Sequence, residues 1–374
     1  MTTQDYASIV LTNSSQLIVE SLARAGADSF VGYPITPANL LYLYASKRFR
    51  IFSAAPDEIT TLQLMSGYAA AGRIPVTATS FPGYALMIEG INMAVMMELP
   101  MVIVLVQRLG PATGTATLGA QGDISLLQGT ISGGLALPAF SISSPLDCWE
   151  LSAEAVEVAV RHRTPVVIFT SKDEVMTKYS LDLRTLRPIS RVTRAEWGGN
   201  GSGNSDGNGQ SLVPPFLPVT CRDRQVRFTA STHDAHGIIQ NASPEGLNNS
   251  VRLHKKVVEN LPEYTHYDLD EQTGADTLIV SFGITAQAAR EAVIRIRESG
   301  GQVSLLVVKT LLPIPKAYYE ICARYGRVFF AEENLTGQYR QLMFGATSPE
   351  QIRGINQFGK MITPETIEKA VQHA

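Results

Sequence analysis

The sequence predicts an α/β protein in which a parallel sheet is followed by a second, smaller α/β domain. Short runs of apolar and β-branched residues alternate along the chain with longer stretches of helical periodicity. The short runs are apolar throughout, as is typical of parallel strands whose two faces are both covered by helices. A stretch rich in Gly, Asn and Ser at residues 195–212 divides this pattern into two parts.

The first domain is predicted at residues 1–190. Runs such as PMVIVLVQ predict its strands, and longer patterns such as PLDCWELSAEAVEVAVRH predict the helices between them. The predicted strands are 29–33, 75–80, 100–107 and 164–172, and the helical stretches include 58–72 and 145–162.

Residues 31–41, VGYPITPANLL, predict a stiff corner between a strand and a helix. Proline lacks a backbone donor and fixes φ, so Pro34 is expected at the strand end and Pro37 in the first turn of the helix. Thr36 therefore presents a small hydroxyl between two rigid positions.

Residues 191–268 are predicted to form a linker and an irregular connection. The Gly/Asn/Ser-rich part has almost nothing to bury, so it is expected to be a spacer or a surface insertion. The α/β rhythm returns near residue 270, and the second domain is predicted at 269–374. Its strand and helix patterns are 275–283, 284–300, 301–315 and 326–334.

Composition excludes several classes of protein. With 374 residues, 45% apolar residues and a net charge of -3, the chain lacks the basic surface of a nucleic-acid-binding protein. Cys148, Cys221 and Cys322 are far apart and have no spacing that could hold zinc or an iron-sulfur cluster. The sequence shows neither a signal peptide nor a membrane span, so a cytoplasmic location is expected.

Four polar residues follow apolar runs of the first domain: Thr36 follows the first strand, Glu58 follows IFSAAPD, Ser80 follows PVTAT and Arg108 follows PMVIVLVQ. Taken singly, each has an ordinary explanation as a helix cap, a first-turn carboxylate or a surface cation. In open parallel sheets, however, ligands bind at the carboxyl ends of the strands. Four such residues at successive strand ends therefore favour a binding site.

Several motifs, in this order and spacing, resemble the α subunit of the 2-oxoacid:ferredoxin oxidoreductases, in the branch that uses 2-oxoglutarate, branched-chain or aromatic 2-oxo acids. The resemblance covers nearly all of the chain outside the Gly/Asn/Ser-rich stretch. The motifs are GYPITPA, DEITTLQLMSGYAAAG, VTATSFPGYALMIEGINMAVMMELPMVIVLVQRLGPATGTAT, QGDI, STHDAHG, LIVSFGITAQAAREAV, KTLLPIP and VFFAEENLTGQ.

The resemblance implies an enzyme that uses thiamine diphosphate and decarboxylates a 2-oxo acid, reducing ferredoxin and forming an acyl-coenzyme A. This chain would supply the pyrimidine-binding domain, followed by a transketolase C-terminal-like domain. A β subunit would carry the diphosphate site, Mg²⁺ and a [4Fe-4S] cluster, and γ and δ subunits can accompany it. No phosphate-cradling GxGxxG loop, and no GxxxxGK followed by Ser or Thr, occurs in this sequence, which fits a chain that holds half of the active site.

The resemblance also implies roles for individual residues. Glu58 matches the glutamate that activates the cofactor, and an apolar pocket is expected to raise its pKa; Asp57 is the rival carboxylate. Thr36 and Arg108 match residues that contact the substrate. Residues 80–83, which are Ser80, Phe81, Pro82 and Gly83, match a cofactor-binding segment.

Two departures from the family pattern concern the same pocket. Relatives read TSGPG where this chain has TSFPG, so Phe81 either lies beside the cofactor or turns into the core. Relatives that use 2-oxoglutarate carry a lysine where this chain has Leu118 and a glutamate where it has Ala120. With Thr117, these residues are expected to favour an apolar 2-oxo acid over a dicarboxylate.

The remaining candidates are weaker. His233 and His236 lack further ligands and are expected to be solvated or capping, so no metal site is predicted in this chain. Two other functions stay open: a thiamine-diphosphate decarboxylase or ligase subunit without iron-sulfur chemistry, and a non-catalytic scaffold subunit of the same fold.

Overall fold

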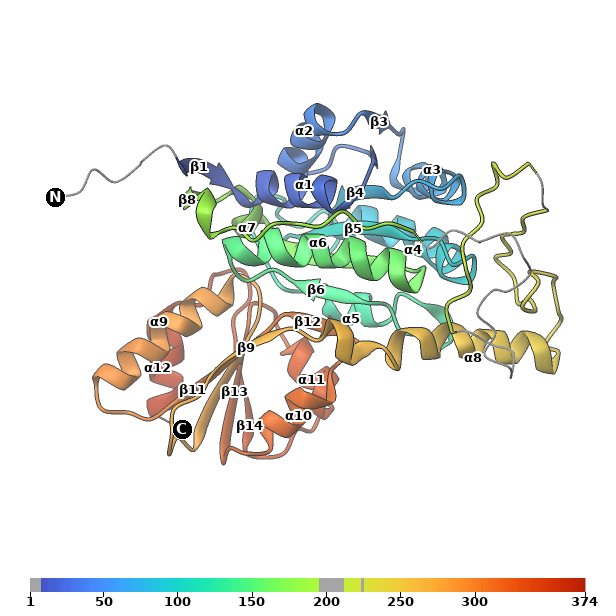
Figure 1. Ribbon diagram of the computed structural model, residues 1–374. Helices are drawn as coiled ribbons and strands as arrows, with labels where there is room; N and C mark the ends of the chain where they lie inside the picture. The colour runs from blue at the N-terminus through green and yellow to red at the C-terminus, as the bar shows by residue number, and fades with distance from the viewer. Residues whose placement is uncertain (1–7, 195–211, 223–224, 374) are drawn as a thin grey trace.

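A computed structural model describes residues 8–194, 212–222 and 225–373 of the chain (Figure 1). All but the last residue of the Gly/Asn/Ser-rich stretch predicted at 195–212 lies outside these residues. Within the described part, no helix combines the length and the apolar character needed to cross a membrane.

The first domain is built on a seven-stranded sheet with the strand order β12-β6-β7-β5-β4-β2-β3. All neighbouring strands run parallel except β12, which pairs antiparallel with β6 at one edge. The strands are β2 (Ser29–Gly32), β3 (Ile51–Ala54), β4 (Pro75–Thr79), β5 (Met101–Gln107), β6 (Ala139–Ser141), β7 (Pro165–Ser171) and β12 (Thr310–Leu312).

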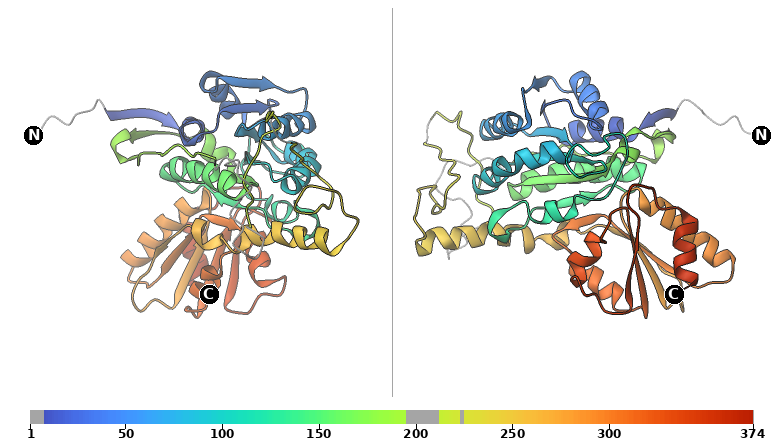
Figure 2. Two further views of the ribbon diagram at one scale, coloured as in Figure 1. Left: turned by 45° about the vertical axis from the view of Figure 1, so that its right-hand side comes forward. Right: turned by 180° about the vertical axis from the view of Figure 1, so that it is seen from behind.

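Helices cover both faces of this sheet, because both faces of its central strands are apolar. In β5, Ile103 packs toward α3 and α4, whereas Val102 and Val104 pack toward α1 and α6. Figures 1 and 2 show these two helical layers from the front and from behind. The helices are α1 (Ser14–Ala25), α2 (Asn39–Arg48), α3 (Glu58–Ala70), α4 (Phe81–Met96), α5 (Ile124–Gln128), α6 (Pro145–His162) and α7 (Lys172–Met176).

Short elements complete the first domain. Strands β1 (Ile9–Asn13) and β8 (Lys178–Asp182) form a separate antiparallel pair. Two 3₁₀ turns, at Ser132–Gly134 and Leu183–Thr185, lie in the loops.

The second domain is a five-stranded sheet with the strand order β14-β13-β10-β11-β9, in which only β9 is antiparallel. Helices α9 and α12 pack on one face, and α10 and α11 pack on the other. The elements are β9 (Tyr267–Asp270), β10 (Thr277–Ser281), α9 (Thr285–Glu298), β11 (Ser304–Val308), α10 (Lys316–Cys322), β13 (Arg327–Glu332), α11 (Gln338–Phe344), β14 (Ile352–Asn356) and α12 (Pro364–Gln372).

The two domains share structure instead of meeting only at a surface. Strand β12 follows β11 in the chain but belongs to the seven-stranded sheet. One hydrophobic cluster continues from α3, α4 and β5 into β10, β13 and α11. The boundary predicted at residues 268 and 269 falls inside β9, so sequence alone placed a division where the fold is continuous.

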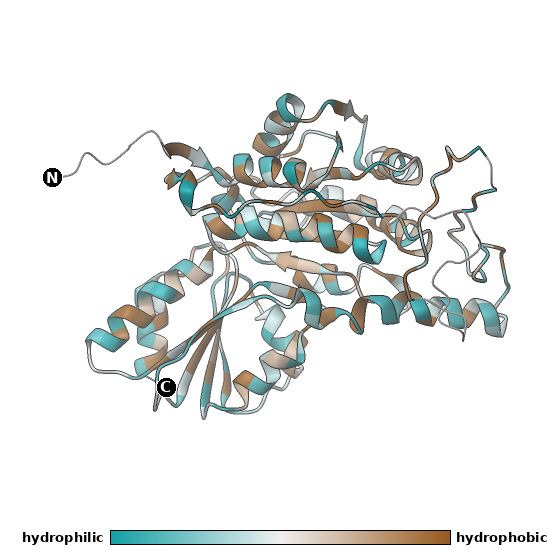
Figure 3. Cartoon of the chain, viewed as in Figure 1, coloured by the Kyte–Doolittle hydropathy of each residue, from teal (hydrophilic) through white to brown (hydrophobic). Residues whose placement is uncertain are grey.

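The connection predicted as irregular contains a regular helix, α8 (Pro244–Val258), and a 3₁₀ turn at Leu261–Tyr264. The Ser243 side chain accepts a hydrogen bond from Gly246 N–H, and Pro244 occupies the first turn, where its missing N–H is harmless. The prediction of irregularity was wrong here because the inward face of α8 carries charged residues as well as Leu253 and Val257. Figure 3 shows the resulting mixture of hydrophilic and hydrophobic residues along this helix.

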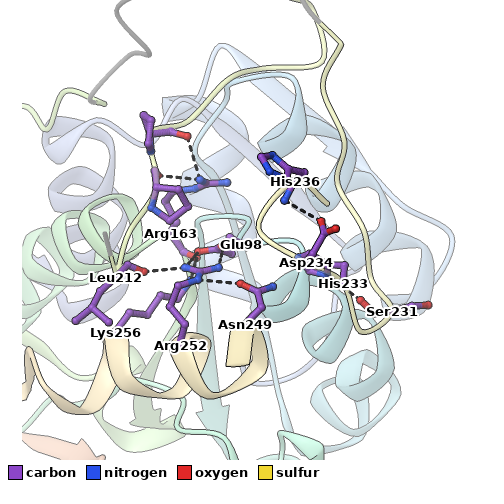
Figure 4. A network of polar contacts seen from close by, with 12 residues as sticks. Glu98, Arg163, Leu212, Ser231, His233, Asp234, His236, Asn249, Arg252 and Lys256 are labelled. Carbon is purple, nitrogen blue, oxygen red and sulfur yellow. Dashed lines mark hydrogen bonds and ion pairs between the residues drawn. The ribbon is translucent and has the colours of Figure 1, made fainter. Parts of the chain in front are cut away.

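A buried ionic cluster holds α8 against the first domain (Figure 4). The Glu98 carboxylate accepts hydrogen bonds from Arg252 at 2.6 and 3.1 Å and from Lys256 Nζ at 2.7 Å. Lys256 is fully buried and also donates to the Arg163 carbonyl at 2.9 Å. Burial alone would raise the pKa of Glu98, but Lys256 and Arg252 hold it well below its usual range. One anion therefore connects the end of α4 to α8.

Replacing Glu98 with Gln should lower the free energy of unfolding by about 3 kcal/mol, because two buried cations lose their counter-charge. Urea unfolding of the isolated chain measures this. The matched control is Glu259→Gln, which removes an exposed partner of Lys255 at 4.0 Å and should change stability by less than about 0.5 kcal/mol. Equal effects of the two substitutions would contradict the structural role of Glu98.

Candidate active site

The four polar residues predicted at strand ends lie along one edge of the sheet. Thr36 follows β2, Glu58 follows β3, Ser80 follows β4 and Arg108 follows β5. These strands are immediate neighbours in the order β5-β4-β2-β3, and they run parallel. Parallel pairing therefore gathers the four residues at the same carboxyl edge.

The corner at residues 31–41 differs from its prediction in one respect. Helix α2 begins at Asn39 with Ala38 as its N-cap, so Pro37 lies in the turn before the helix and not in its first turn. The Thr36–Pro37 peptide bond is cis. The interpretation of a sharp, proline-bounded corner otherwise agrees with the structure.

Glu58 and Asp57 are neighbours with different environments. The Asp57 side chain caps α3 by accepting a hydrogen bond from Thr60 N–H at 2.6 Å, and such bonds lower its pKa. Glu58, the first residue of α3, is only 6% exposed. Burial raises the pKa of Glu58, and the charge of Asp57 adds to this effect. Of the two carboxyls, Glu58 is therefore the one whose environment favours the protonated form.

The first turn of α4 closes directly on the Glu58 carboxyl. A Cβ atom built on Gly83 would lie 2.5 Å from Glu58 Oε1 and would also overlap Thr79 Oγ1. Only glycine allows the helix to approach so closely. Ser80 is the N-cap of α4, and its buried Oγ has no hydrogen-bond partner within the described structure. The Glu58 carboxyl thus packs against the first turn of α4, whose N-cap carries an unsatisfied hydroxyl.

Phe81 and Pro82 open α4 and are both half-buried. Phe81 belongs to none of the hydrophobic core clusters, so its ring does not turn into the core. Of the two positions considered for Phe81, the core is therefore excluded, and a place beside the cofactor stays a prediction.

Arg108 and Thr36 lie in direct contact. Arg108 Nη1 donates a hydrogen bond to the Thr36 carbonyl oxygen at 2.6 Å. The Asn39 side chain donates to Thr36 Oγ1 at 3.0 Å, which leaves the hydroxyl proton of Thr36 available to another acceptor. Arg108 is 5% exposed, and its buried Nε has no partner in the described residues. Two donors are therefore positioned together at this edge.

Asp123 is a charged neighbour of Arg108 for which sequence reasoning gave no role. Its backbone N–H donates to the Gln107 side chain at 3.3 Å, and its buried Oδ2 has no partner among the described residues. Burial raises the pKa of Asp123 to about 7, although the Arg108 charge opposes the shift. The only sequence signal was the QGDI motif, which does not show that the aspartate meets Arg108.

Residues 109–118 form a loop that returns to its starting point. Leu109 N–H donates to the Leu118 carbonyl at 2.8 Å, and Thr115 N–H donates to the Leu109 carbonyl at 2.9 Å. Gly114 makes the turn with a φ of +50°, where a Cβ atom would overlap the Leu109 carbonyl. The loop brings half-buried Leu118 next to the residue that follows Arg108, whereas Thr117 is exposed.

The segment containing His233 and His236 forms a turn, which Figure 4 shows together with the cluster around Glu98. The Asp234 carboxylate accepts hydrogen bonds from the backbone N–H groups of His236 and Ile238 at 2.9 and 3.0 Å. Across the described part of the chain, no group of three or more His, Cys, Asp or Glu residues is arranged to hold a metal ion.

Comparison with known protein families identifies the family to which the chain belongs. Residues 20–252 match the family described as pyruvate flavodoxin/ferredoxin oxidoreductase, thiamine diphosphate-binding, and residues 275–365 match the pyruvate:ferredoxin oxidoreductase core domain II. The chain belongs to the α subunits of the 2-oxoacid:ferredoxin oxidoreductases. The predicted family and the predicted α/β fold, a thiamine-diphosphate-binding domain followed by a smaller domain, are confirmed.

Similar proteins act on two kinds of 2-oxo acid. The ketoisovalerate oxidoreductase subunit VorB of Methanothermobacter thermautotrophicus is 31% identical over 356 residues, covering 93% of each chain. The 2-oxoglutarate synthase subunit KorA of the same organism is 28% identical over 366 residues, covering 92% of this chain and 93% of its own. The predicted function, a subunit of a coenzyme A-dependent 2-oxo acid oxidoreductase, is confirmed at this level.

Solved structures agree. The 2-oxoglutarate:ferredoxin oxidoreductase of Magnetococcus marinus, solved with 2-oxoglutarate, coenzyme A and succinyl-CoA bound, superposes with a TM-score of 0.88 and 26% identity. The match covers 98% of this chain but 65% of that one. A split-gene transketolase superposes with a TM-score of 0.55 at 14% identity and shows only the shared fold.

Gly83→Ala should destabilise the isolated chain by about 1–3 kcal/mol, because the new methyl group overlaps the Glu58 carboxyl. The control is Gly67→Ala on α3, where a Cβ atom meets nothing within 4 Å. This change should stabilise the chain by up to about 1 kcal/mol, the ordinary gain in a helix. Chemical unfolding of both variants measures the contrast, and a stabilised Gly83→Ala would contradict the tight packing on Glu58.

Asp123→Asn should change how stability depends on pH. The pKa of Asp123 in the folded chain, about 7, lies above the ordinary value of 3.8, so folding favours the protonated form. The stability that this proton contributes is complete at low pH and is lost as pH rises toward 7. Between about pH 4 and 7, the free energy of unfolding of the variant should therefore rise relative to that of the wild type. The limiting slope of this difference is about 1.4 kcal/mol per pH unit. Urea unfolding across this range tests the prediction, and parallel pH curves would contradict it.

Proposed function

We propose that this chain supplies the pyrimidine side of a thiamine-diphosphate site, and that Glu58 is its acid-base residue. The observation that supports this most directly is the packing of Gly83 on the buried Glu58 carboxyl, whose pKa is raised. The unsatisfied Ser80 Oγ lies at the start of the same helix. The residues present therefore fit the pyrimidine ring of the cofactor, with Phe81 and Pro82 flanking it.

Thiamine diphosphate, when bound, supplies a carbon nucleophile and an electron sink for decarboxylation of a 2-oxo acid. The Glu58 carboxyl would hold or release a proton at a ring nitrogen of the cofactor. A carboxyl with an ordinary pKa would be ionised at neutral pH and could not donate, so the burial of Glu58 serves this role. The Asp57 carboxylate is engaged in capping α3 and does not compete.

Arg108 and Thr36 would bind the substrate. The guanidinium of Arg108 is a fork of donors suited to a carboxylate, and its contact with the Thr36 carbonyl fixes its direction. The Thr36 hydroxyl, which accepts from Asn39, can donate its own proton to the 2-oxo oxygen or to the carboxylate.

The partner would supply the rest of the active site. We assign the diphosphate site, Mg²⁺ and the [4Fe-4S] cluster to a β subunit, with ferredoxin as the electron acceptor and further γ and δ subunits as companions. This assignment rests on the family resemblance, on the three free cysteines of this chain, and on the lack of a metal-binding group in its described residues.

The substrate would be a monocarboxylic 2-oxo acid with an apolar tail. The loop that carries half-buried Leu118 and buried Ala120 returns to the residue after Arg108, so an apolar side chain stands near the carboxylate-binding end. A second substrate carboxylate would have to be desolvated without a cation from this loop. The similarity to a ketoisovalerate oxidoreductase subunit agrees with this class. A cation from the partner would favour 2-oxoglutarate instead, the substrate in the name of another relative.

A panel of 2-oxo acids, assayed on the complex reconstituted with its partner, coenzyme A and a viologen acceptor, tests the function. Apolar monocarboxylates should exceed 2-oxoglutarate by at least about tenfold in kcat/KM, which needs about 1.4 kcal/mol. Leu118→Lys should shift the ranking toward 2-oxoglutarate. Glu58→Gln, the negative control, should lose about 10²- to 10⁴-fold in turnover. If 2-oxoglutarate is the best substrate of the unchanged complex, the proposed substrate class is wrong.

A further inference from the structure

The segment that carries Asp123 is held in place by the second domain. Gln121, which is 1% exposed, makes all of its hydrogen bonds across the domain boundary. Its Nε2 donates to the Phe282 carbonyl at 2.8 Å, and its Oε1 accepts from Thr285 Oγ1 at 3.0 Å and from Glu333 N–H at 2.9 Å. Its backbone N–H donates to the Glu333 carbonyl at 2.9 Å, and its carbonyl accepts from Asn334 Nδ2 at 3.1 Å.

Gln338, the first residue of α11, forms a second connection on the other side of Asp123. Its Oε1 accepts from Ser125 N–H at 3.0 Å, and its Nε2 donates to the Gly122 carbonyl at 2.8 Å. A side-chain amide can both donate and accept, so one glutamine fixes two backbone groups of the same segment. Residues 121, 122 and 125, which flank Asp123, are thus hydrogen-bonded to the second domain through Gln121 and Gln338.

The first domain holds this segment by apolar packing, because Ile124 is buried in the shared hydrophobic cluster, but it contributes few hydrogen bonds. Residues 108–123 contain no helix and no strand, and the bond from Asp123 N–H to the Gln107 side chain is long at 3.3 Å. The Asp123 carboxylate nevertheless acts on Arg108 through its charge, although the two side chains share no hydrogen bond in the described structure. The second domain therefore supplies most of the hydrogen bonds that fix residues 121–125, and with them the position of Asp123 relative to Arg108.

We propose that Gln338 and Gln121 are positioning residues for substrate binding: through them, the second domain holds Asp123 beside Arg108 without letting it occupy the guanidinium. This inference rests on the proposed function of Arg108. A counter-charge at a fixed distance orients the guanidinium and leaves its remaining donors for the substrate carboxylate. A released Asp123 could form its own ion pair with Arg108 and compete with the substrate.

Gln338→Met tests the proposal, because it removes both bonds from a half-buried side chain of similar length. The matched control is Gln341→Met on the same helix, whose Nε2 donates to the Thr336 carbonyl at 2.7 Å, within the second domain. Hydrogen exchange on the full-length chain should show at least about tenfold faster exchange of the Ser125 amide in Gln338→Met only. In the reconstituted complex, KM for the preferred 2-oxo acid should rise about tenfold with kcat nearly unchanged, since uniform binding is lost.

Gln338→Glu provides a second variant, because a carboxylate still accepts a hydrogen bond from Ser125 N–H but cannot donate one to the Gly122 carbonyl. Its KM should lie between the KM of the wild type and that of Gln338→Met. Unchanged exchange in Gln338→Met would overturn the positioning role. Faster exchange with an unchanged KM would overturn the link to Arg108. If the wild-type complex oxidises no 2-oxo acid, the proposed function fails, and the exchange comparison still decides whether Gln338 holds the segment.

Discussion

Parallel pairing of four neighbouring strands is the constraint on which the candidate site depends. Because β5, β4, β2 and β3 run in the same direction, the residue after each strand reaches the same edge of the sheet. The strands can be buried on both faces because their side chains are apolar at successive positions. The four polar residues of the candidate site therefore lie at the strand ends, where helices α3 and α4 begin.

The chain treats buried charges in two different ways. Glu98 is surrounded by cations that hydrogen-bond to it, so its pKa is held low and its role is structural. Glu58 and Asp123 are buried with far less compensation, and their pKa values are raised. Leaving a carboxyl uncompensated costs stability, so such groups are typical of sites where protons or charges must change. The contrast separates the anchor of α8 from the groups at the sheet edge.

Strands β2, β4, β5, β7, β10 and β13, the α/β order and the four strand-end residues could be predicted from the sequence, because apolar runs and their spacing determine them locally. Helix α8 could not be predicted, because Arg252 and Lys256 on its inward face have the sequence pattern of a solvated face. Only the structure shows that both pair with the buried Glu98. The roles of Asp123 and Gln121 were also hidden. Gln121 depends on contacts with residues far away in the chain, such as Glu333, and the QGDI motif does not reveal the partners of either residue.

The second domain is connected to the first in two ways. The two domains share a hydrophobic core, and strand β12, which follows β11 in the chain, belongs to the seven-stranded sheet. Titration of the isolated chain with thiamine diphosphate by calorimetry, beside the reconstituted complex, tests most directly whether the chain provides only half of the cofactor site. Weak or undetectable binding to the isolated chain and tight binding to the complex are expected. Submicromolar affinity of the isolated chain, on the order of -8 kcal/mol or better, would contradict the division of the site between two subunits.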